Sequence, residues 1–486
     1  MRVNLLVDGR CLRNWHGELA RKLAGSCDVS VEFAGDCPPA SSAAEILFAF
    51  ETGLHRLPPV KLAARAARAS LDGFLSRPAC KADLTIDLCG VARAGPGRVW
   101  QLTFDGAPGE AGLIAALAQG RMPLAALREN GRTIAAGRLG NESYGLLSTA
   151  FELSLIGTAT LVAAAVCGNR GGAALRGEAP APAVSVFEFA ARAARDVLRS
   201  TARRLHGLRH RTPHWRTGWR KLAGPDVLDL RAHPAGGWRE LPDDGLRFYA
   251  DPFPIEVGGR LTLFVEEYPH ATRRGLVSAV EFGPEGPLGR PEPVLQLPYH
   301  LSYPFVFERD GEIWMIPESG ANGTIDLFRA TRFPGGWVRE ATLVANIVAA
   351  DATLLERDGR WWMFATVQSN GGCHSDALHL WSAPDFRGPW TAHKRNPVLI
   401  DVAAARPAGR IVLRDGALWR PAQDCRKAYG GALALARILQ LDDEGFEQQV
   451  ETVIGAGPLW EGKWLHTLNR AGGFEFIDGE GVARRF

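Results

Sequence analysis

Five segments in the second half of the chain repeat one pattern, and this repeat limits the possible folds more than any other feature. Each segment contains an apolar strand, a two-residue turn and a second apolar strand. The turns are Gly258-Gly259, Asp310-Gly311, Asp358-Gly359, Asp415-Gly416 and Gly472-Gly473. These dipeptides supply the positive φ angles that a two-residue hairpin needs. Because the segments begin roughly 50 to 58 residues apart, which is the spacing of propeller blades, the pattern predicts a five-bladed β-propeller.

A tryptophan recurs in the outer part of three repeats, at Trp238, Trp337 and Trp390. Such a residue is either a platform for a sugar ring or a packing residue between blades. Because the same residue type recurs at corresponding positions, the packing role is favoured. We therefore assign these three tryptophans to the propeller core.

The two ends of each hairpin carry polar side chains. In an antiparallel hairpin the start of the first strand and the end of the second lie at the same edge, so five radial hairpins place these ends around one mouth of the axial channel. The sequence therefore predicts a ring of carboxylates around an axial pocket. The side chains expected there are Asp251, Tyr303, Asp351, Arg406 and His466 from the strand starts, Glu266, Glu267, Glu318, Gln423, Asp424 and Asp478 from the strand ends, and the added Tyr249, Tyr268 and His300.

A ring of this composition is suited to a carbohydrate. Carboxylates and amides accept hydrogen bonds from sugar hydroxyl groups, and aromatic faces cover the apolar side of the sugar. Cleavage of a glycosidic bond also needs two carboxyl groups, one ionised and one protonated. We predict Asp251 as nucleophile or base, Glu318 as acid, and Asp351 as the residue that orients sugar hydroxyls and tunes the acid. The alternative for Asp251 and Asp351 is structural, in which each caps a turn or binds neighbouring backbone N–H groups.

The phrases YADPFP and LWSAPDFRGPW, with the aspartates that open the first and third repeats, resemble the five-bladed propeller glycosidases of the arabinanase, xylosidase and invertase type. This resemblance implies that Asp251 matches the catalytic aspartate of blade one and Asp351 the aspartate of blade three. The general-acid glutamate that those enzymes place later in the chain has no clear counterpart, because blade four ends in RPAQDC. From Tyr249 to the end, the chain more closely resembles the propeller domain that precedes the glycosyltransferase module of plant glucosamine inositolphosphorylceramide transferase and that also occurs in bacterial proteins.

The loop SNGGCHSD, residues 369–376, brings Cys373, His374 and Asp376 together beside blade three. A metal site is one interpretation, and a loop that covers the substrate is favoured because no partner set of ligands occurs elsewhere. Arg406 and Arg420 are candidates for binding a phosphate or an acidic sugar. We predict His374 and Arg406 among the substrate-binding residues, and we predict no metal site and no cofactor.

The first half of the chain alternates apolar strands with helices. RVNLLVD is followed by an amphipathic helix, and further strands are expected at VSVEFAG, DLTIDLCG and RVWQLTF. The alternation predicts a Rossmann-like α/β domain over residues 1–167. No GxGxxG or Walker loop follows the first strand, so a nucleotide is not supported, and Asp87 and Asp105 are expected to be turn residues. The domain faintly resembles the N-terminal domain of formyltransferases fused to this propeller in bacterial homologues, which implies formyl transfer as a remote function, although the His-Pro-Ser motif of that family is absent.

Residues 168–222 are predicted to be a linker and a basic helix that precede a propeller over residues 223–486. GNRGGAALRGEAPAPAV is a Gly/Ala/Pro linker, and residues 190–222 hold ten Lys and Arg residues against the single Asp196. Peripheral contact with an anionic membrane is one interpretation of this stretch. A solvated helix that leads into a strand, HWRTGWRKL, which closes the propeller, is the other. We favour the second, because the arginines are spread around the helix.

Bulk properties limit the remaining classes. Lys plus Arg number 56 against 53 Asp plus Glu, a net charge of +3, so no global field marks a nucleic-acid binder. Eight cysteines are scattered without a regular framework, as expected of reduced thiols. The first apolar run is too short for a signal peptide, and the apolar segment at residues 151–167 contains Glu152, so a buried helix is favoured over a membrane span. We expect a cytoplasmic protein.

Two functions are compatible with these features. The first is a carbohydrate-active enzyme that transfers or cleaves a glycosyl unit in the axial pocket, during synthesis of a surface polysaccharide or glycolipid. The second is a propeller that only binds a glycan. An enzyme loses turnover but keeps sugar affinity when Asp251 is replaced by Asn, whereas a binding module has no turnover to lose.

Overall fold

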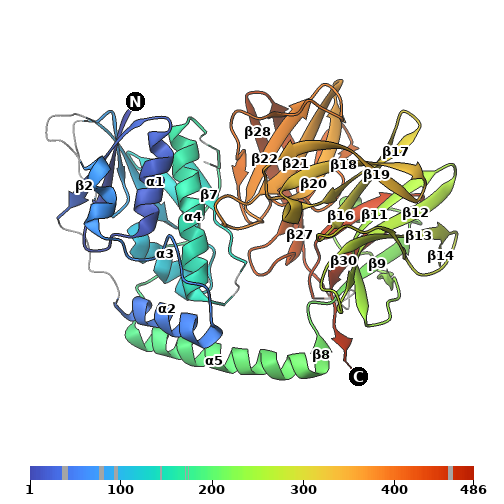
Figure 1. Ribbon diagram of the computed structural model, residues 1–486, viewed down its shortest axis with the longest axis horizontal. Helices are drawn as coiled ribbons and strands as arrows, with labels where there is room; N and C mark the ends of the chain where they lie inside the picture. The colour runs from blue at the N-terminus through green and yellow to red at the C-terminus, as the bar shows by residue number, and fades with distance from the viewer. Residues whose placement is uncertain are drawn as a thin grey trace. The chain divides into compact units, whose positions relative to one another are not determined.

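The computed structural model describes residues 1–35, 42–75, 82–91, 97–142, 145–169, 171–172, 174–457 and 463–485. The chain forms two compact units. The N-terminal unit contains residues 1–202 together with 369–373 and 399–401, and the propeller unit contains residues 203–368, 374–398 and 402–486. In Figure 1 the long helices belong to the first part of the chain, and the part coloured from yellow to red consists almost entirely of strands.

The N-terminal unit is built on a mixed sheet with the strand order β2-β1-β3-β4-β6-β7. The first four of these strands pair in parallel, whereas β6 and β7 add an antiparallel hairpin. All four strands expected from the sequence are present, and the Rossmann-like classification of the unit stays a prediction. The strands are β1 (Arg2–Asp8), β2 (Asp28–Ala34), β3 (Leu84–Asp87), β4 (Arg98–Phe104), β5 (Ala107–Pro108), which pairs with β4, β6 (Leu124–Glu129) and β7 (Arg132–Arg138).

The helices of this unit are α1 (Asn14–Ala24), α2 (Ser42–His55), the 3-10 helix η1 (Arg68–Phe74), α3 (Gly109–Ala118) and α4 (Leu147–Val166). Among the described residues, α4 is the one helix long and apolar enough to cross a membrane, and 67% of its apolar window is buried. Its Glu152 carboxylate accepts hydrogen bonds from the backbone N–H groups of Lys61, Leu62 and Ala63. In this structure α4 therefore belongs to the core of the unit, as the sequence predicted.

The polar residues at two strand ends are turn residues, as predicted. The carboxylate of Asp87 accepts hydrogen bonds from the backbone N–H groups of Cys89 and Gly90. Asp105 has a φ angle of +47° and accepts a hydrogen bond from the N–H of Leu124. Both carboxylates thus stabilise the local backbone.

Helix α5 (Val186–Arg209) and the short strand β8 (His210–Arg211) precede the propeller. Of the side chains of α5, only Phe189 and Asp196 are buried. The strand β9 (Trp215–Lys221) follows and pairs antiparallel with β30, which comes from the C-terminal end of the chain. This confirms the predicted closing strand, and it places the first strand of the propeller inside the stretch 168–222 that the sequence assigned to a linker and helix.

The propeller unit contains five antiparallel sheets, which confirms the predicted five blades. Blade 1 contains β11 (Arg247–Val257), β12 (Arg260–Pro269), β13 (Leu276–Gly283), β14 (Gly286–Pro287) and β15 (Glu292–Leu295). Blade 2 contains β16 (Ser302–Arg309), β17 (Glu312–Glu318), β18 (Thr324–Arg332) and β19 (Gly335–Ala345). Blade 3 contains β20 (Ala349–Arg357), β21 (Arg360–Val367), β22 (Ala377–Ala383), β23 (Thr391–Ala392) and β24 (Leu399–Ile400). Blade 4 contains β25 (Val412–Arg414), β26 (Ala417–Asp424), β27 (Ala432–Asp442) and β28 (Gly445–Ile454), and blade 5 contains β29 (Thr467–Ala471), β30 (Phe474–Glu480), β9 and β10 (Arg239–Glu240).

The hairpin turns have the geometry that the sequence predicted. All ten residues of the five turn dipeptides have φ angles between +52° and +77°. Successive left-handed residues give the type I′ turn, whose twist matches that of the flanking strands. The Gly and Asp residues at these positions therefore fix the register of each inner hairpin.

The axis of the propeller is closed by packed side chains. Arg410, which precedes β25 of blade 4, is half-buried, and its guanidinium donates hydrogen bonds to the carbonyls of Pro254 in blade 1 and Val306 in blade 2. Burial lowers the pKa of Arg410 to about 10. The three repeated tryptophans are half-buried and pack against the hydrophobic clusters of the blades, which confirms their assignment to the core.

Candidate functional site

Three blades share a distortion at the start of their innermost strand. The pairing register of β11, β16 and β20 shifts by a β-bulge at this point. The residues in the bulges, Asp251, Tyr303 and Asp351, have φ angles of +49°, +43° and +58°. Non-glycine residues seldom adopt this conformation, and when they do they cluster at functional sites. The three bulges therefore mark one mouth of the axis as the candidate functional site.

The bulged residues link neighbouring blades through their backbone N–H groups. Asp251 N–H donates to Asp478 of blade 5 at 2.7 Å, and Tyr303 N–H donates to Asp251 at 3.1 Å. Asp351 N–H donates to Glu318 of blade 2 at 3.2 Å. Carboxylates from different blades are thus drawn to a common centre, as the sequence predicted.

One side of this ring is an acid–histidine–acid group. His466 lies between two carboxylates, with Nδ1 at 2.6 Å from Asp478 and Nε2 at 3.6 Å from Asp251. Asp251 also accepts a hydrogen bond from the hydroxyl of Thr467 at 3.0 Å, and its residue is only 4% exposed. Burial opposes the charged form of His466, yet the adjacent Asp478 carboxylate raises its pKa above the ordinary value.

The other side of the ring is organised by a buried arginine. Arg406 Nε donates to Asp351 at 2.6 Å, and its Nη2 lies 3.4 Å from the carboxylate of Glu318. The side-chain amide of Gln423 donates to Asp351 at 2.9 Å. Asp351 is only 2% exposed, whereas the side chain of Glu318 is 19% exposed. Glu318 therefore belongs to the open edge of the ring.

Glu266 and His300 form a second part of the open edge. His300 Nδ1 accepts a hydrogen bond from the N–H of Gly275 at 2.8 Å, and its Nε2 lies 3.4 Å from Glu266. The His300 side chain is 38% exposed. Burial lowers the pKa of His300, which therefore offers a neutral ring to its surroundings.

Burial gives the carboxyl groups of the ring unusual protonation. It raises the pKa of Asp251 to about 6, although the nearby His466 acts in the opposite direction. It raises the pKa of Asp351 to about 7, opposed by Arg406 and reinforced by Glu318. Glu266 has a pKa well above its usual range, because of burial and then of the neighbouring Asp251. The ring thus holds both ionised and protonated carboxyls near neutral pH, which is the condition for acid–base chemistry.

A metal ion was not predicted from the sequence. Within the described residues, one group of ligand atoms lies close enough to hold a cation, namely Asp251, His466 and Asp478 within 4.8 Å of one another. The short His466–Asp478 contact accounts for this closeness without an ion. The residues Cys373, His374 and Asp376 do not form such a group.

Several predicted site residues lie elsewhere. Because side chains alternate along a strand, Glu267 of β12 and Asp424 of β26 point to the face opposite Glu266 and Gln423. Glu267 binds Arg247, and Asp424 binds Arg426. Tyr249 packs in a hydrophobic cluster between blades. His374 is half-buried, and its described contact with the ring is its carbonyl, 3.5 Å from Arg406 Nη1.

One tyrosine and one arginine that the sequence singled out, Tyr303 and Arg420, have structural partners. Tyr303 is fully buried, and its hydroxyl lies 2.9 Å from that of Thr353 and 2.7 Å from the N–H of Gly409. This burial leaves no aromatic face of Tyr303 for a sugar. Arg420 is buried inside blade 4, where its guanidinium donates to backbone carbonyls. Arg406, in contrast, is part of the ring.

Tyr429 and Trp215 belong to the site but were not predicted. The Tyr429 hydroxyl lies 3.3 Å from Arg406, and its ring meets that of Trp215 edge to face. Trp215 stacks on His466 with ring centroids 4.2 Å apart. Tyr429 follows the end of β26, and the rule that the hairpin ends lie at the mouth of the axis could have indicated it. Trp215 comes from the closing strand, to which that rule does not apply. The half-buried Tyr429 supplies the aromatic surface that Tyr303 does not.

One described cavity of the propeller, of about 280 Å³, lies apart from the ring. Its lining includes Asp226, Trp419 and Asn469, and none of its lining residues belongs to the ring.

Comparison with known proteins finds a family model that matches part of the propeller. Residues 242–471 match the family described as glucosamine inositolphosphorylceramide transferase 1, N-terminal. Proteins named glucosamine inositolphosphorylceramide transferase 1 from Oryza sativa subsp. japonica and Arabidopsis thaliana are each 33% identical to the chain, over 234 and 205 residues. The matches cover 46% and 41% of this chain but only 31% and 27% of those proteins. The chain thus spans about a third of the length of the relatives it matches.

Solved propeller structures are more distant. A family 117 glycoside hydrolase of Zobellia galactanivorans has a TM-score of 0.36 and 13% identity, covering 56% of this chain and 91% of that one. An exo-β-1,3-galactanase of Phanerochaete chrysosporium has a TM-score of 0.34 and 13% identity, covering 44% of this chain and 54% of that one.

Proposed function

We propose that the propeller binds a glycosyl unit over the ring of carboxylates and catalyses its transfer or hydrolysis there. The observation that carries this proposal is the convergence of Asp251, Glu266, Glu318 and Asp351 from three blades around Arg406 and His466. Substrate contact is proposed for the open edge, made by Glu266, His300, Glu318 and Tyr429. Carboxylates there accept hydrogen bonds from sugar hydroxyls, and the Tyr429 ring covers the apolar side of the sugar.

The pKa values suggest how the chemistry is divided. Burial, and then the neighbouring Asp251 carboxyl, hold the pKa of Glu266 well above its usual range, so Glu266 suits the group that protonates the departing glycosidic oxygen. Asp251, with a pKa of about 6, is ionised above that pH and suits the base that takes a proton from the incoming hydroxyl or water. Asp351 and Arg406 hold Glu318 in place. The sequence predicted Glu318 as the acid, and the environment of Glu266 makes it the better donor.

A non-catalytic glycan-binding propeller is the second candidate. It is favoured by the burial of Asp251 and Asp351, whose carboxylates are already bound by Thr467, Arg406 and Gln423. In that case the buried acids only fix the shape of the site. The two candidates differ in whether any bond is broken.

The substrate class is proposed from the relatives. Their name refers to glucosamine transfer to an inositolphosphorylceramide, so we propose a lipid-linked or polysaccharide-linked sugar at the cytoplasmic side of a membrane. The role is proposed to lie in synthesis of a surface polysaccharide or glycolipid. Formyl transfer by residues 1–167 stays a prediction from resemblance.

The catalytic proposal is tested with the full chain. Binding of glucosamine, galactose, xylose and arabinose is measured by calorimetry, and turnover is measured with their nitrophenyl glycosides and with uridine diphosphate sugars. Glu266→Gln is expected to lower turnover at least a hundredfold and to keep sugar affinity within threefold, a loss of the size typical of a general acid. Glu256→Gln, an exposed residue of the same blade, is the matched control.

The outcomes separate the candidates. Sugar binding without turnover of any substrate assigns the propeller to the binding class. Loss of turnover in Glu318→Gln but not in Glu266→Gln returns the acid role to Glu318. If no sugar binds and no sugar is released or transferred, the carbohydrate proposal fails.

Peripheral contact with an anionic membrane through residues 190–222 is also proposed, with helix α5 as its centre. Phe187, Leu198 and Leu205 are spaced 11 and 7 residues apart, which places them on one face of the helix. Phe187 is 87% exposed and Leu198 69% exposed, whereas the buried Phe189 and Asp196 lie on the opposite face. An apolar stripe on a soluble helix needs a partner.

The charge of α5 favours a lipid surface as that partner. Arg195, Arg199 and Arg209 fall along one flank of the stripe, as their spacing from Leu198 and Leu205 requires. An apolar face bordered by arginines is typical of helices that lie in the interface of anionic membranes. The sequence alone favoured a solvated helix, because the arginines are spread around the helix. The structure shows which apolar side chains of α5 are exposed, and only then do three of the arginines form a flank beside them.

Vesicle sedimentation tests this contact. The full chain is expected to bind phosphatidylcholine vesicles that contain phosphatidylserine, and to be released as salt rises, because the charges are screened. Leu198→Glu with Leu205→Glu is expected to lower binding at least tenfold. Leu288→Glu with Leu413→Glu, at exposed leucines of the propeller, is the matched control. Equal binding to vesicles without phosphatidylserine, or a dimer broken by the α5 variant, would contradict the proposal.

A further inference from the structure

The N-terminal unit contains a cavity that the proposed function does not use. It has a volume of about 250 Å³ and lies where Asp8 ends β1, where Cys89 follows β3, and where α1 and α3 begin with His16 and Glu110 in their first turns. In the order β2-β1-β3, the two strands that follow β1 in the sequence pair with it on opposite edges, so the strand order reverses between β1 and β3. Such a point leaves a crevice at the carboxyl ends of the strands, where open α/β sheets bind ligands.

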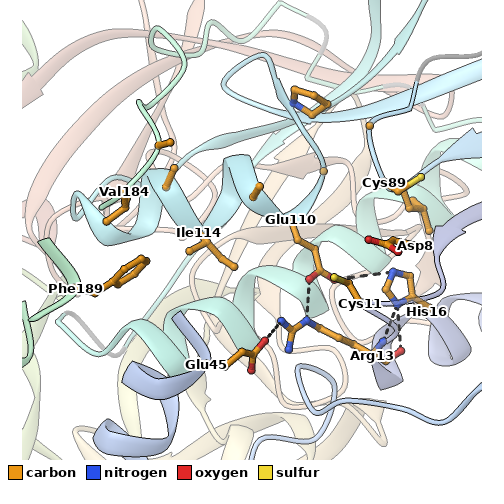
Figure 2. A pocket seen from close by; sticks show the side chains of 17 residues that line it. Asp8, Cys11, Arg13, His16, Glu45, Cys89, Glu110, Ile114, Val184 and Phe189 are labelled. Carbon is orange, nitrogen blue, oxygen red and sulfur yellow. Dashed lines mark hydrogen bonds and ion pairs between the residues drawn. The ribbon is translucent and has the colours of Figure 1, made fainter. Parts of the chain in front are cut away.

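The cavity has a polar end and an apolar end. In Figure 2, Phe189, Val184 and Ile114 lie on one side, and Asp8 and His16 lie on the other. The apolar residues come from α3, from the segment that leads into α5, and from the first turn of α5. A ligand that fills this space has a polar head and an apolar body.

The charges that line the polar end are balanced by arginines. Asp8, Glu45 and Glu110 are the acidic lining residues. Asp8 pairs with Arg10 at 3.4 Å. Glu45 pairs with Arg65 at 3.1 Å and also with Arg13. Arg13 pairs in addition with Glu110 at 2.8 Å. A charged ligand that enters this end loses its hydration, and the charged groups it meets are already paired. The free-energy cost of its desolvation is therefore not offset by a new ion pair. The lining therefore favours an uncharged head.

His16 supplies an unused hydrogen-bond donor. The residue is only 4% exposed, and its Nδ1 accepts a hydrogen bond from the backbone N–H of Arg13 at 3.1 Å. Burial lowers the pKa of His16, so the ring is neutral. Nδ1 also lies 3.2 Å from the Arg13 carbonyl, but because the Arg13 N–H can only donate, Nδ1 is assigned as the acceptor and the ring proton to Nε2. That nitrogen lies 3.9 Å from Glu110, too far for a hydrogen bond, and has no other hydrogen-bond partner in the described ranges. A buried donor of this kind calls for an acceptor on a ligand.

We propose that this cavity binds an uncharged amphipathic small molecule whose head is an amide or a hydroxyl group. The oxygen of the head accepts the hydrogen bond from His16 Nε2–H. Its N–H or O–H donates to the carboxylate of Asp8. The apolar body lies against Ile114, Val184 and Phe189.

Four probes of equal length test the head group. Binding of hexanamide, 1-hexanol, hexanoate and hexylammonium to the full chain is measured by calorimetry. Hexanamide and 1-hexanol are expected to bind at least tenfold more tightly than both charged probes. Equal or tighter binding of hexanoate or hexylammonium overturns the proposal, and so does the absence of binding by all four at millimolar concentration.

Variants place the probe in the cavity. Ile114→Trp fills the apolar end and is expected to lower hexanamide binding at least tenfold, whereas Ile46→Trp, at an exposed position of α2, leaves it unchanged. His16→Leu removes the donor and is expected to lower hexanamide binding at least tenfold. Unchanged hexanamide binding in Ile114→Trp, or in a folded His16→Leu protein, contradicts the proposal.

Discussion

Asp351 makes the stability of the propeller depend on pH in a direction that can be calculated. Burial raises the pKa of this carboxyl to about 7 from 3.8, opposed by Arg406. A tenfold change in the acid dissociation constant corresponds to about 1.36 kcal/mol, so ionising Asp351 costs the folded protein about 4 kcal/mol. Because the folded pKa is the higher one, this stability is present below about pH 4 and is lost as the pH rises through 7. Between these values the free energy of unfolding falls by up to about 1.4 kcal/mol per pH unit from this group.

The substitution Asp351→Asn removes that titration. The free energy of unfolding of the wild type is expected to fall more steeply between pH 4.5 and 6.5 than that of the variant, by about 1 kcal/mol per pH unit. Urea unfolding followed by tryptophan fluorescence measures this, because all of the 14 tryptophans except Trp15 and Trp100 lie beyond residue 203. Asp358→Asn, at an exposed turn of the same hairpin, is the control. Parallel pH profiles for wild type and Asp351→Asn would refute the reasoning.

Three further changes test the fold. Gly359→Ala, at a φ angle of +72°, is expected to destabilise the propeller by about 1–2 kcal/mol in urea unfolding, whereas Gly207→Ala inside α5 is expected to be neutral or stabilising. Thr217→Pro puts a proline inside the buried closing strand and is expected to cost about 3 kcal/mol or more, whereas Thr391→Pro at an exposed short strand costs far less by the same assay. Arg410→Met leaves two buried carbonyls without their donor and is expected to lower the midpoint of thermal unfolding, with a cost of about 1–3 kcal/mol for each carbonyl. If the unfolding midpoint of any of these three test variants equals that of the wild type, the structural role given to that residue is contradicted.

Local sequence rules predicted the blades because each inner hairpin is specified by its own residues. Two-residue turns require positive φ angles, and Gly and Asp at the turn positions supply them. The closing strand was predicted for a similar reason, since an isolated strand before the first blade needs a partner. Its pairing with β30 moves the first propeller strand to Trp215, which no local rule could indicate.

The candidate site was predicted less completely. The hairpin argument brought Asp251, Asp351 and His466 to one mouth of the axis. It did not separate Glu266 from Glu267, because which side of a strand faces the axis depends on the bulge and on the neighbouring blade. It also gave Tyr303 to the substrate, although packing across the axis buries this residue completely.

By itself, the sequence determined the number of blades, their turns and the polar character of their inner ends, because these depend on residues close together in the chain. Tertiary structure decided which carboxylates share the ring, which of them hold protons, which aromatic ring stays open, and that the apolar stripe of α5 faces solvent. Those properties depend on burial and on distances between residues far apart in sequence. Protonation in particular is set by lost hydration and by neighbouring charges, which exist only once the blades are assembled.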